Sequence, residues 1–181
     1  MKLASESRLE DRFKTIALDF IHTNGGLRQN RTENAFCTRY YINSDQLYIE
    51  NYPRRTPKMA FNPGAMLKED ELYIFPRLIF EYHNYVSSIG LAKLNIEMAI
   101  QGQIPSPLSS KIILWPRNLW EFRGCEDARI YGDLNRTLML YTGYGYLLRN
   151  EELVTTIVQA VADLDDQFIP RKRGFLTIKG E

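Results

Sequence analysis

The residues best suited to chemistry form the run Gly124-Cys125-Glu126-Asp127-Ala128-Arg129, in which two adjacent carboxylates precede a guanidinium. An acid held against an arginine stays ionised, whereas an acid in a partly apolar cleft can keep its proton and act as a general acid. Trp115 and Trp120 lie just upstream and could line such a cleft. In a strand, Glu126 and Asp127 would point to opposite faces, one toward an arginine and the other toward a pocket. A surface turn with a salt bridge is the alternative.

Two further clusters carry polar groups. Asn62 precedes a Pro-Gly pair, which is typical of an ordinary turn. Arg77 lies within the apolar run 72–80, where its charge needs a partner. That partner could be a carboxylate in a buried salt bridge, or an anion or sugar hydroxyls. We interpret Tyr82 and Tyr85, which follow this run, as packing residues, although exposed aromatic side chains also stack on sugars.

The sequence gives little indication of nucleotide, serine-hydrolase or metal chemistry. The common nucleotide-binding, serine-hydrolase and zinc-protease motifs are absent from it. With only His22 and His83, a metal site would need carboxylates for most of its ligands, so we predict no metal. Cys37 and Cys125 lie far apart in the sequence and predict neither a disulfide nor a zinc site.

The elements that must position these side chains are mostly strands. Capping residues and helical spacing of apolar residues predict one amphipathic helix over residues 7–21, ending near Asn24-Gly25-Gly26, and then a loop to Asn34. Short β-rich runs follow, with no second helix of convincing length, and residues 101–110, with two prolines, read as a linker. The predicted strands are 36–42, 46–51, 64–68, 71–80, 85–94, 111–115, 127–131, 137–144 and 153–162. Antiparallel meanders of this kind build a sandwich, a barrel or a propeller.

Composition indicates an ordinary globular domain. The 181 residues are 44% hydrophobic and 25% charged, with 23 basic against 22 acidic residues. A net charge of +1 gives little long-range attraction to nucleic acid or to an anionic membrane, so we predict neither as a partner. The sequence shows no export signal or apolar span, which predicts a cytoplasmic protein.

Taken in order, the clusters resemble glycoside hydrolase family 130, the mannoside phosphorylases and related glycosidases. The resemblance covers about residues 36–146. It rests on five motifs in this order: Asn62-Pro63-Gly64-Ala65, Arg77, Ser88-Ile89-Gly90-Leu91-Ala92, Gly124-x-Glu126-Asp127-x-Arg129 and Tyr141-Thr142.

The resemblance implies an all-β fold of the five-bladed β-propeller type and an inverting cleavage of a mannoside or oligosaccharide. Inorganic phosphate, or water in some members, would be the nucleophile, and no other cofactor is implied. Asp127 would be the general acid, so that one carboxylic acid suffices where other glycosidases need two. Asn62 and Arg77 would line the mannosyl subsite, Ser88 would contact substrate, and Glu126 and Arg129 would hold the acid.

Two features depart from the family pattern. Ala128 replaces the proline of the motif, which loosens the backbone beside the acid. A five-bladed propeller needs about 300 residues, so 181 supply only about the first three blades, as part of a longer protein or a natural truncation. We expect a helix and loop over residues 1–35, a partial propeller over 36–181, and exposed sheet edges that make the chain unstable or drive it into homo-oligomers.

Three functions remain open at this point. The first is an inverting β-mannoside phosphorylase or hydrolase with Asp127 as proton donor. The second is a catalytically silent sugar-binding or oligomerisation module. The third is a five-bladed furanosidase, which would need a second and a third carboxylate for which the sequence offers no obvious candidates.

Overall fold

The computed structural model describes residues 4–24, 40–132 and 136–177. The chain divides into two units, Met1–Arg39 and Tyr40–Glu181. In the first, helix α1 (Ala4–Asn24) ends at the asparagine that precedes two glycines in the sequence. No described helix is long and apolar enough to cross a membrane.

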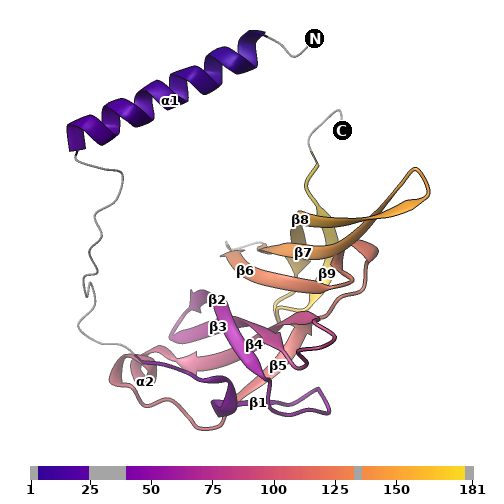
Figure 1. Cartoon of the computed structure of the whole chain (residues 1–181). Coiled ribbons are helices and arrows are strands. Elements are labelled where there is room, and N and C mark those ends of the chain that lie inside the picture. The colour runs from indigo at the N-terminus through magenta and orange to yellow at the C-terminus, as the bar shows by residue number, and fades with distance from the viewer. Residues whose placement is uncertain (1–3, 25–39, 133–135, 178–181) are drawn as a thin grey trace. The chain divides into compact units, whose positions relative to one another are not determined.

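The second unit begins with a four-stranded antiparallel sheet (Figure 1). Its strands follow one another in the order β2-β3-β4-β5, and β1 (Leu47–Ile49) adds to the outer edge, parallel to β5. Leucine, isoleucine and phenylalanine side chains are buried along these strands, and six consecutive residues of β4 are buried, so this strand is covered on both faces. The strands are β2 (Met59–Lys68), β3 (Glu71–Ile79), β4 (Ser87–Asn95) and β5 (Leu108–Leu114).

A second antiparallel sheet, in the order β6-β7-β8-β9, completes this unit. Its strands are β6 (Gly124–Gly132), β7 (Thr137–Arg149), β8 (Glu152–Leu164) and β9 (Pro170–Phe175). The long β7–β8 hairpin turns at Asn150 and Glu151, whose φ angles of 49° and 67° are typical of a tight hairpin turn. The described residues of this unit thus form two antiparallel meanders, β2-β3-β4-β5 with β1 at its edge and β6-β7-β8-β9.

The two sheets meet along their first strands. Strand β2 runs beside β6, and a Cβ added to Gly64 would lie 2.4 Å from the carbonyl oxygen of Ala128. Ser87 and Gly124 form a bridge between β4 and β6. A common core then packs across the junction, with Phe75 and Ile89 from one sheet and Tyr141 from the other.

Several predicted elements need correction. The strand predicted over 36–42 lies mostly outside the described residues, and residues 40–42 are not in a strand. The strand predicted to begin at Gly64 begins at Met59, because the Pro-Gly pair sits in a bulge within β2 and not in a turn. The strand predicted to begin at Asp127 begins three residues earlier, at Gly124.

The predicted linker over residues 101–110 is shorter in the structure. A six-residue helix, α2 (Ile96–Gln101), ends at Gly102, whose φ of 72° forms a left-handed cap. Strand β5 begins at Leu108, directly after Pro107, so the last three residues of the predicted linker are already in the sheet. The strand predicted over 153–162 is β8, and β9 follows it as a further strand.

Candidate active site

Two bulges face each other where the sheets meet. The pairing of β2 with β3 shifts between Phe61 and Gly64, and that of β6 with β7 shifts between Glu126 and Arg129. Within these bulges Asn62 and Asp127 have φ angles of 45° and 53°, a left-handed conformation that asparagine and aspartate tolerate better than most residues. The bulges therefore aim two polar side chains into the junction between the sheets.

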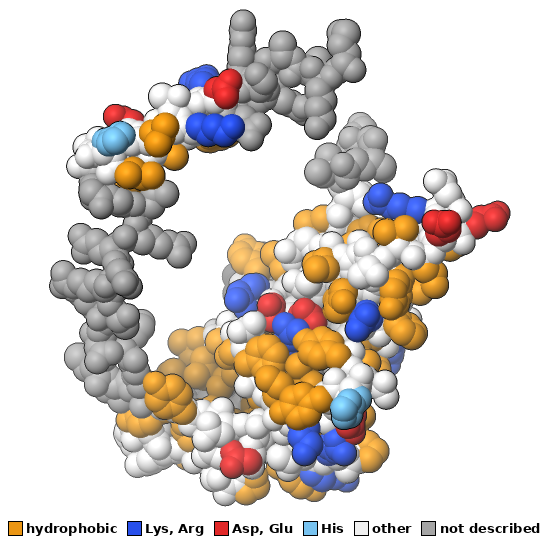
Figure 2. Space-filling model, viewed as in Figure 1, with side chains coloured by type: hydrophobic (Ala, Val, Ile, Leu, Met, Phe, Trp, Pro, Cys, Tyr) orange, Lys and Arg blue, Asp and Glu red, His pale blue; other side chains and the backbone are white. Residues whose placement is uncertain are grey.

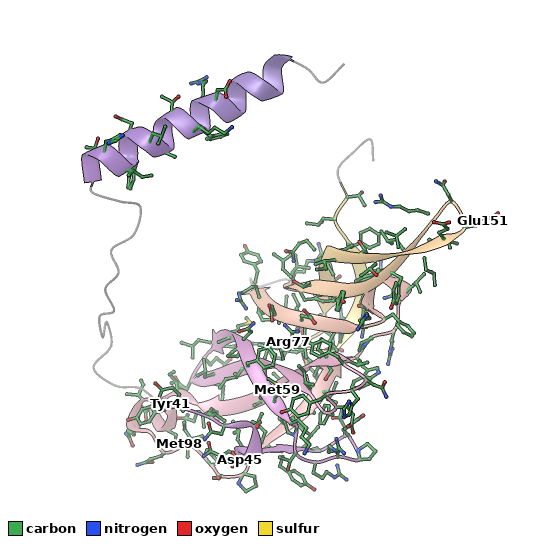
Figure 3. All side chains as sticks on the ribbon, in the orientation of Figure 1. Tyr41, Asp45, Met59, Arg77, Met98 and Glu151 are labelled. Carbon is green, nitrogen blue, oxygen red and sulfur yellow. The ribbon has the colours of Figure 1, made fainter. Side chains whose placement is uncertain are left out.

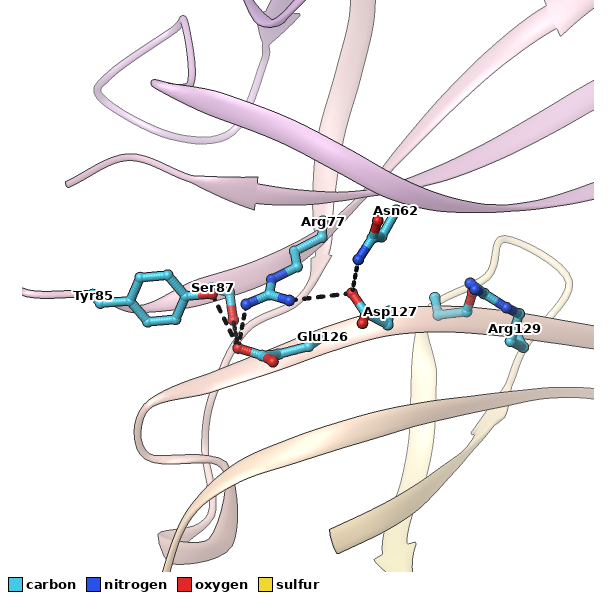
Figure 4. A network of polar contacts seen from close by, with 8 residues as sticks. Asn62, Arg77, Tyr85, Ser87, Glu126, Asp127 and Arg129 are labelled. Carbon is cyan, nitrogen blue, oxygen red and sulfur yellow. Dashed lines mark hydrogen bonds and ion pairs between the residues drawn. The ribbon is translucent and has the colours of Figure 1, made fainter. Parts of the chain in front are cut away.

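Arg77 on β3 connects both carboxylates (Figure 4). Its Nη2 lies 2.7 Å from Glu126 Oε1, and its Nη1 lies 3.2 Å from Asp127 Oδ1. The prediction that Glu126 and Asp127 point to opposite faces is therefore wrong, because the bulge at Asp127 interrupts the alternation of the strand. Figure 3 shows Arg77 at the junction of the two sheets, and its side chain is only 12% exposed.

Asp127 is the more accessible of the two acids. Its side chain is 36% exposed, against 13% for Glu126. Asn62 Nδ2 donates to Asp127 Oδ1 over 3.1 Å, so the bonds from Asn62 and Arg77 both end on the same oxygen. Within the described part of the chain, no hydrogen bond ends on Oδ2.

Glu126 is surrounded by donors. Its Oε1 accepts from Arg77, from Ser87 Oγ at 3.0 Å and from Tyr85 Oη at 3.2 Å. Burial raises the pKa of the Glu126 carboxyl above its ordinary value and the negative charge of Asp127 adds to this, while Arg77 and the hydrogen bond from Ser87 lower it. Glu126 compensates the charge of Arg77 within the protein.

Two expected site residues take other positions. Arg129 contacts neither carboxylate among the described residues; its Nη1 donates to the backbone oxygen of Ala128 over 2.8 Å. Arg77 therefore holds Asp127, as was expected of Arg129. Ser88 is fully buried, and its Oγ has no hydrogen-bond partner within the described ranges. Its neighbour Ser87 bonds to Glu126 instead.

The upstream tryptophans do not line this site. Trp120 packs against Tyr141 and Phe175, and Trp115 stacks on Tyr52, both within the packing of the sheets. The aromatic residues at the site are Phe61 and Tyr85, whose ring centroids lie 4.9 Å and 5.5 Å from the guanidinium carbon of Arg77. Figure 2 shows this acidic and basic group at the surface, bordered by apolar side chains.

Tyr85 and Ser87 were missed as site residues. Tyr85 was interpreted as packing, and its half-buried ring does pack on Arg77, but its hydroxyl also contacts Glu126. Tyr82 is 63% exposed, so its interpretation as a packing residue is wrong. Ser87 and Ser88 are adjacent in a strand, and their residue types give no signal as to which of the two faces the acid.

A third carboxylate, Glu121, is fully buried and stabilises the fold. It lies in the short helix η2 (Leu119–Glu121) and accepts a hydrogen bond from the Tyr141 hydroxyl on β7. The backbone and side chain of Asn118 donate to it, and Arg173 Nη1 on β9 lies 3.3 Å away. Burial and the neighbouring Glu121 raise the pKa of the Tyr141 hydroxyl, so it remains a donor. Glu121 thus connects three segments of the second sheet.

One hollow of the described surface, of about 230 Å³, is lined by Phe61 and Pro63, which flank Asn62 in the sequence. Another, of about 440 Å³, is lined by Glu50, Lys93 and Phe168 among others, and none of the residues bonded to Asp127 lines it. Across the described ranges, no three His, Cys, Asp or Glu side chains gather closely enough to bind a metal ion. The acid group is thus an open surface site at the junction of the two sheets.

The described unit of strands is thus an all-β fold, and its site holds two carboxylates that both pair with one arginine. A family model described as beta-1,4-mannooligosaccharide phosphorylase matches residues 27–171, so the chain belongs to glycoside hydrolase family 130. This match confirms the resemblance noted in the sequence. No curated protein matches the chain.

Two solved structures are similar to part of this chain. The fructan 1-exohydrolase IIa of Cichorium intybus is 16% identical with a TM-score of 0.41, over 67% of this chain and 21% of its own. An exo-1,5-alpha-L-arabinanase from a bovine ruminal metagenomic library is 12% identical with a TM-score of 0.41, over 67% of this chain and 40% of its own. The chain therefore spans less than half of either structure.

Proposed function

We propose that this chain carries the sugar-binding and proton-donating part of an inverting β-mannoside phosphorylase or hydrolase. Asp127 is the general acid, and Arg77 and Asn62 bind sugar hydroxyls. Membership of the family supports the substrate class, a mannooligosaccharide. The observation that carries the proposal is the unequal pair on Arg77: Glu126 is 13% exposed and accepts three hydrogen bonds on one oxygen, whereas Asp127 is 36% exposed and its Oδ2 accepts none from the described residues.

The choice of Asp127 over Glu126 follows from the surroundings of each. A raised pKa favours a proton donor, and burial raises the pKa of Glu126. However, three donors converge on Glu126 Oε1, and the side chain is 13% exposed, so a substrate oxygen has little access to it. Asp127 Oδ2 is accessible and accepts no bond from the described residues. A proton held there can pass to the leaving glycosidic oxygen.

In the proposed reaction, phosphate or water attacks the anomeric carbon from the face opposite Asp127. The bond to the leaving sugar breaks as Asp127 transfers its proton to that oxygen, and the configuration inverts. The two sheets would be blades of a five-bladed propeller, a proposal supported by their antiparallel meander topology and by the family. Inorganic phosphate would be the co-substrate, and no other cofactor is needed.

The test uses β-1,4-mannobiose and inorganic phosphate with the whole chain, and follows mannose 1-phosphate. We expect Asp127→Asn to keep sugar binding and to lower turnover at least about 100-fold, the lower range of a general acid's contribution. Asp45→Asn, at an exposed position in the short helix η1 (Ser44–Gln46), is the matched control. Turnover retained by Asp127→Asn contradicts the assignment of the acid.

The second candidate is a sugar-binding module without turnover. It is favoured by the observation that the described chain supplies a single carboxylate–arginine group at the site. Binding of mannobiose that is lost in Arg77→Leu, without any product from the wild-type chain, would establish this function instead. Oligomerisation is tested separately below.

A further inference from the structure

The loop between β3 and β4, residues 80–86, brings one aromatic side chain against both charges of the site. Tyr85 Oη lies 3.2 Å from Glu126 Oε1, and the Tyr85 ring centroid lies 5.5 Å from the guanidinium carbon of Arg77. We propose that Tyr85 is a positioning residue: its hydroxyl holds Glu126 and its ring holds Arg77, so that Arg77 stays directed at Asp127. This inference rests on the proposed function, in which Arg77 and Asp127 meet the sugar.

The guanidinium needs such support. Both of its terminal nitrogens are used by carboxylates, and its Nε is buried without a hydrogen-bond partner in the described residues. If the two carboxylates on the bulged strand were its only contacts, the guanidinium could shift with either of them. The rings of Tyr85 and Phe61 restrict its plane, because a cation is attracted to an aromatic face.

The hydroxyl has a separate effect, on Glu126. The titratable and charged groups around this carboxyl are Arg77 from β3, Asp127 and Cys125 from β6, and Tyr85 from the loop. A donor to the ionised carboxylate favours the charged form. Tyr85 therefore helps to keep Glu126 ionised and paired with Arg77.

The experiment measures the ionisation of Glu126 directly. The side-chain carboxyl of Glu126 is titrated by carbon-13 NMR in the whole chain, in the wild type, Tyr85→Phe and Tyr131→Phe. Tyr131 is 63% exposed on β6 and serves as the matched control. We expect an upward shift of the Glu126 titration in Tyr85→Phe and none in Tyr131→Phe. An unchanged titration in Tyr85→Phe overturns the proposal.

A second measurement does not depend on removing any group. Placing 3-fluorotyrosine at position 85 makes the hydroxyl a stronger donor and keeps the ring, so the Glu126 titration should shift downward. Opposite shifts for Tyr85→Phe and the fluorinated side chain identify the hydrogen bond itself as the cause. A downward shift alone still supports the proposal should Tyr85→Phe fail to fold, and no shift with the fluorinated side chain contradicts it.

A binding measurement then links Tyr85 to the site. With β-1,4-mannobiose as the probe, Tyr85→Phe should weaken binding several-fold, while Tyr131→Phe should not. Equal affinity of wild type and Tyr85→Phe would overturn the positioning role. If the wild type binds no mannobiose, the proposed function fails, and the Glu126 titration still decides whether Tyr85 holds this acid.

Discussion

Gly64 offers the sharpest test of how the site is built. A Cβ at this position would lie 2.4 Å from the Ala128 carbonyl oxygen and 3.1 Å from its carbonyl carbon. Real Cβ contacts essentially never fall below 3.0 Å, so in Gly64→Ala the strands β2 and β6 must move apart by about 0.6 Å or more. The neighbouring atoms are backbone and cannot rotate away.

The cost can be estimated from this overlap. Overpacking typically costs about 1–3 kcal/mol, and each kcal/mol lowers the melting temperature of a domain of this size by about 2–4 °C. We therefore expect Gly64→Ala to melt about 2–12 °C below a glycine-to-alanine variant that has no overlap. Because the moving carbonyl belongs to the residue after Asp127, the hydrogen bond from Asn62 to Asp127 should also be lost.

The assay is thermal unfolding of the whole chain by circular dichroism, with the Asn62 side-chain amide followed by NMR. Gly174→Ala is the matched control, because a Cβ there meets no atom within 4 Å and the residue is also in a strand. In both variants the alanine restricts the unfolded chain, which stabilises the folded state by about 0.4–1 kcal/mol. The difference between their melting temperatures therefore measures the effect of the overlap alone. Equal melting temperatures for the two variants would refute the reasoning.

Two further predictions concern acidity and association. Burial raises the pKa of Glu126 above its unfolded value near 4.5, so this carboxyl contributes stability that is fully present below the unfolded pKa and is lost as pH rises through the folded pKa. Glu126→Gln cannot ionise, and melts from about pH 4 to 7 should show a smaller decline than in the wild type; parallel curves would argue against it. Leu148, Leu153 and Ile157 are 64%, 61% and 72% exposed on one face of the β7–β8 hairpin, so we expect the chain to self-associate. Ile157→Lys should shift sedimentation velocity profiles toward the monomer, and a wild type already monomeric would contradict this.

The regular parts of the fold were predictable from the sequence. Runs rich in β-favouring residues placed β3, β4 and β8 within two residues of their observed limits, whereas β7 extends five residues beyond its predicted end at Tyr144. The motifs also brought Asn62, Arg77 and Asp127 together correctly, as the hydrogen bonds show. These three residues lie far apart in the chain, so their meeting was implied by the family resemblance rather than by periodicity.

The irregular parts could not be predicted in this way. A bulge adds one residue to a strand without any change of residue type, so the pattern around Asp127 reads as a regular strand. The contacts of Tyr85 and Ser87 with Glu126 span 41 and 39 residues and depend on how two sheets meet. Glu121 reads as a polar turn residue, yet it is fully buried, because Tyr141 and Arg173 from distant strands complete its hydrogen bonds.

The bulge in β6 explains why one arginine can serve two acids with different roles. In a regular strand, neighbouring side chains point to opposite faces, and only one of Glu126 and Asp127 could reach Arg77. The left-handed conformation of Asp127 turns its carboxylate to the same side, and the two acids then differ in exposure, 13% against 36%. Glu126, the less exposed acid, is also held by Ser87 and Tyr85. This difference is what the proposed function uses: Asp127, the more exposed acid, is placed to meet the sugar, and Glu126 stays beside Arg77 as its counterion.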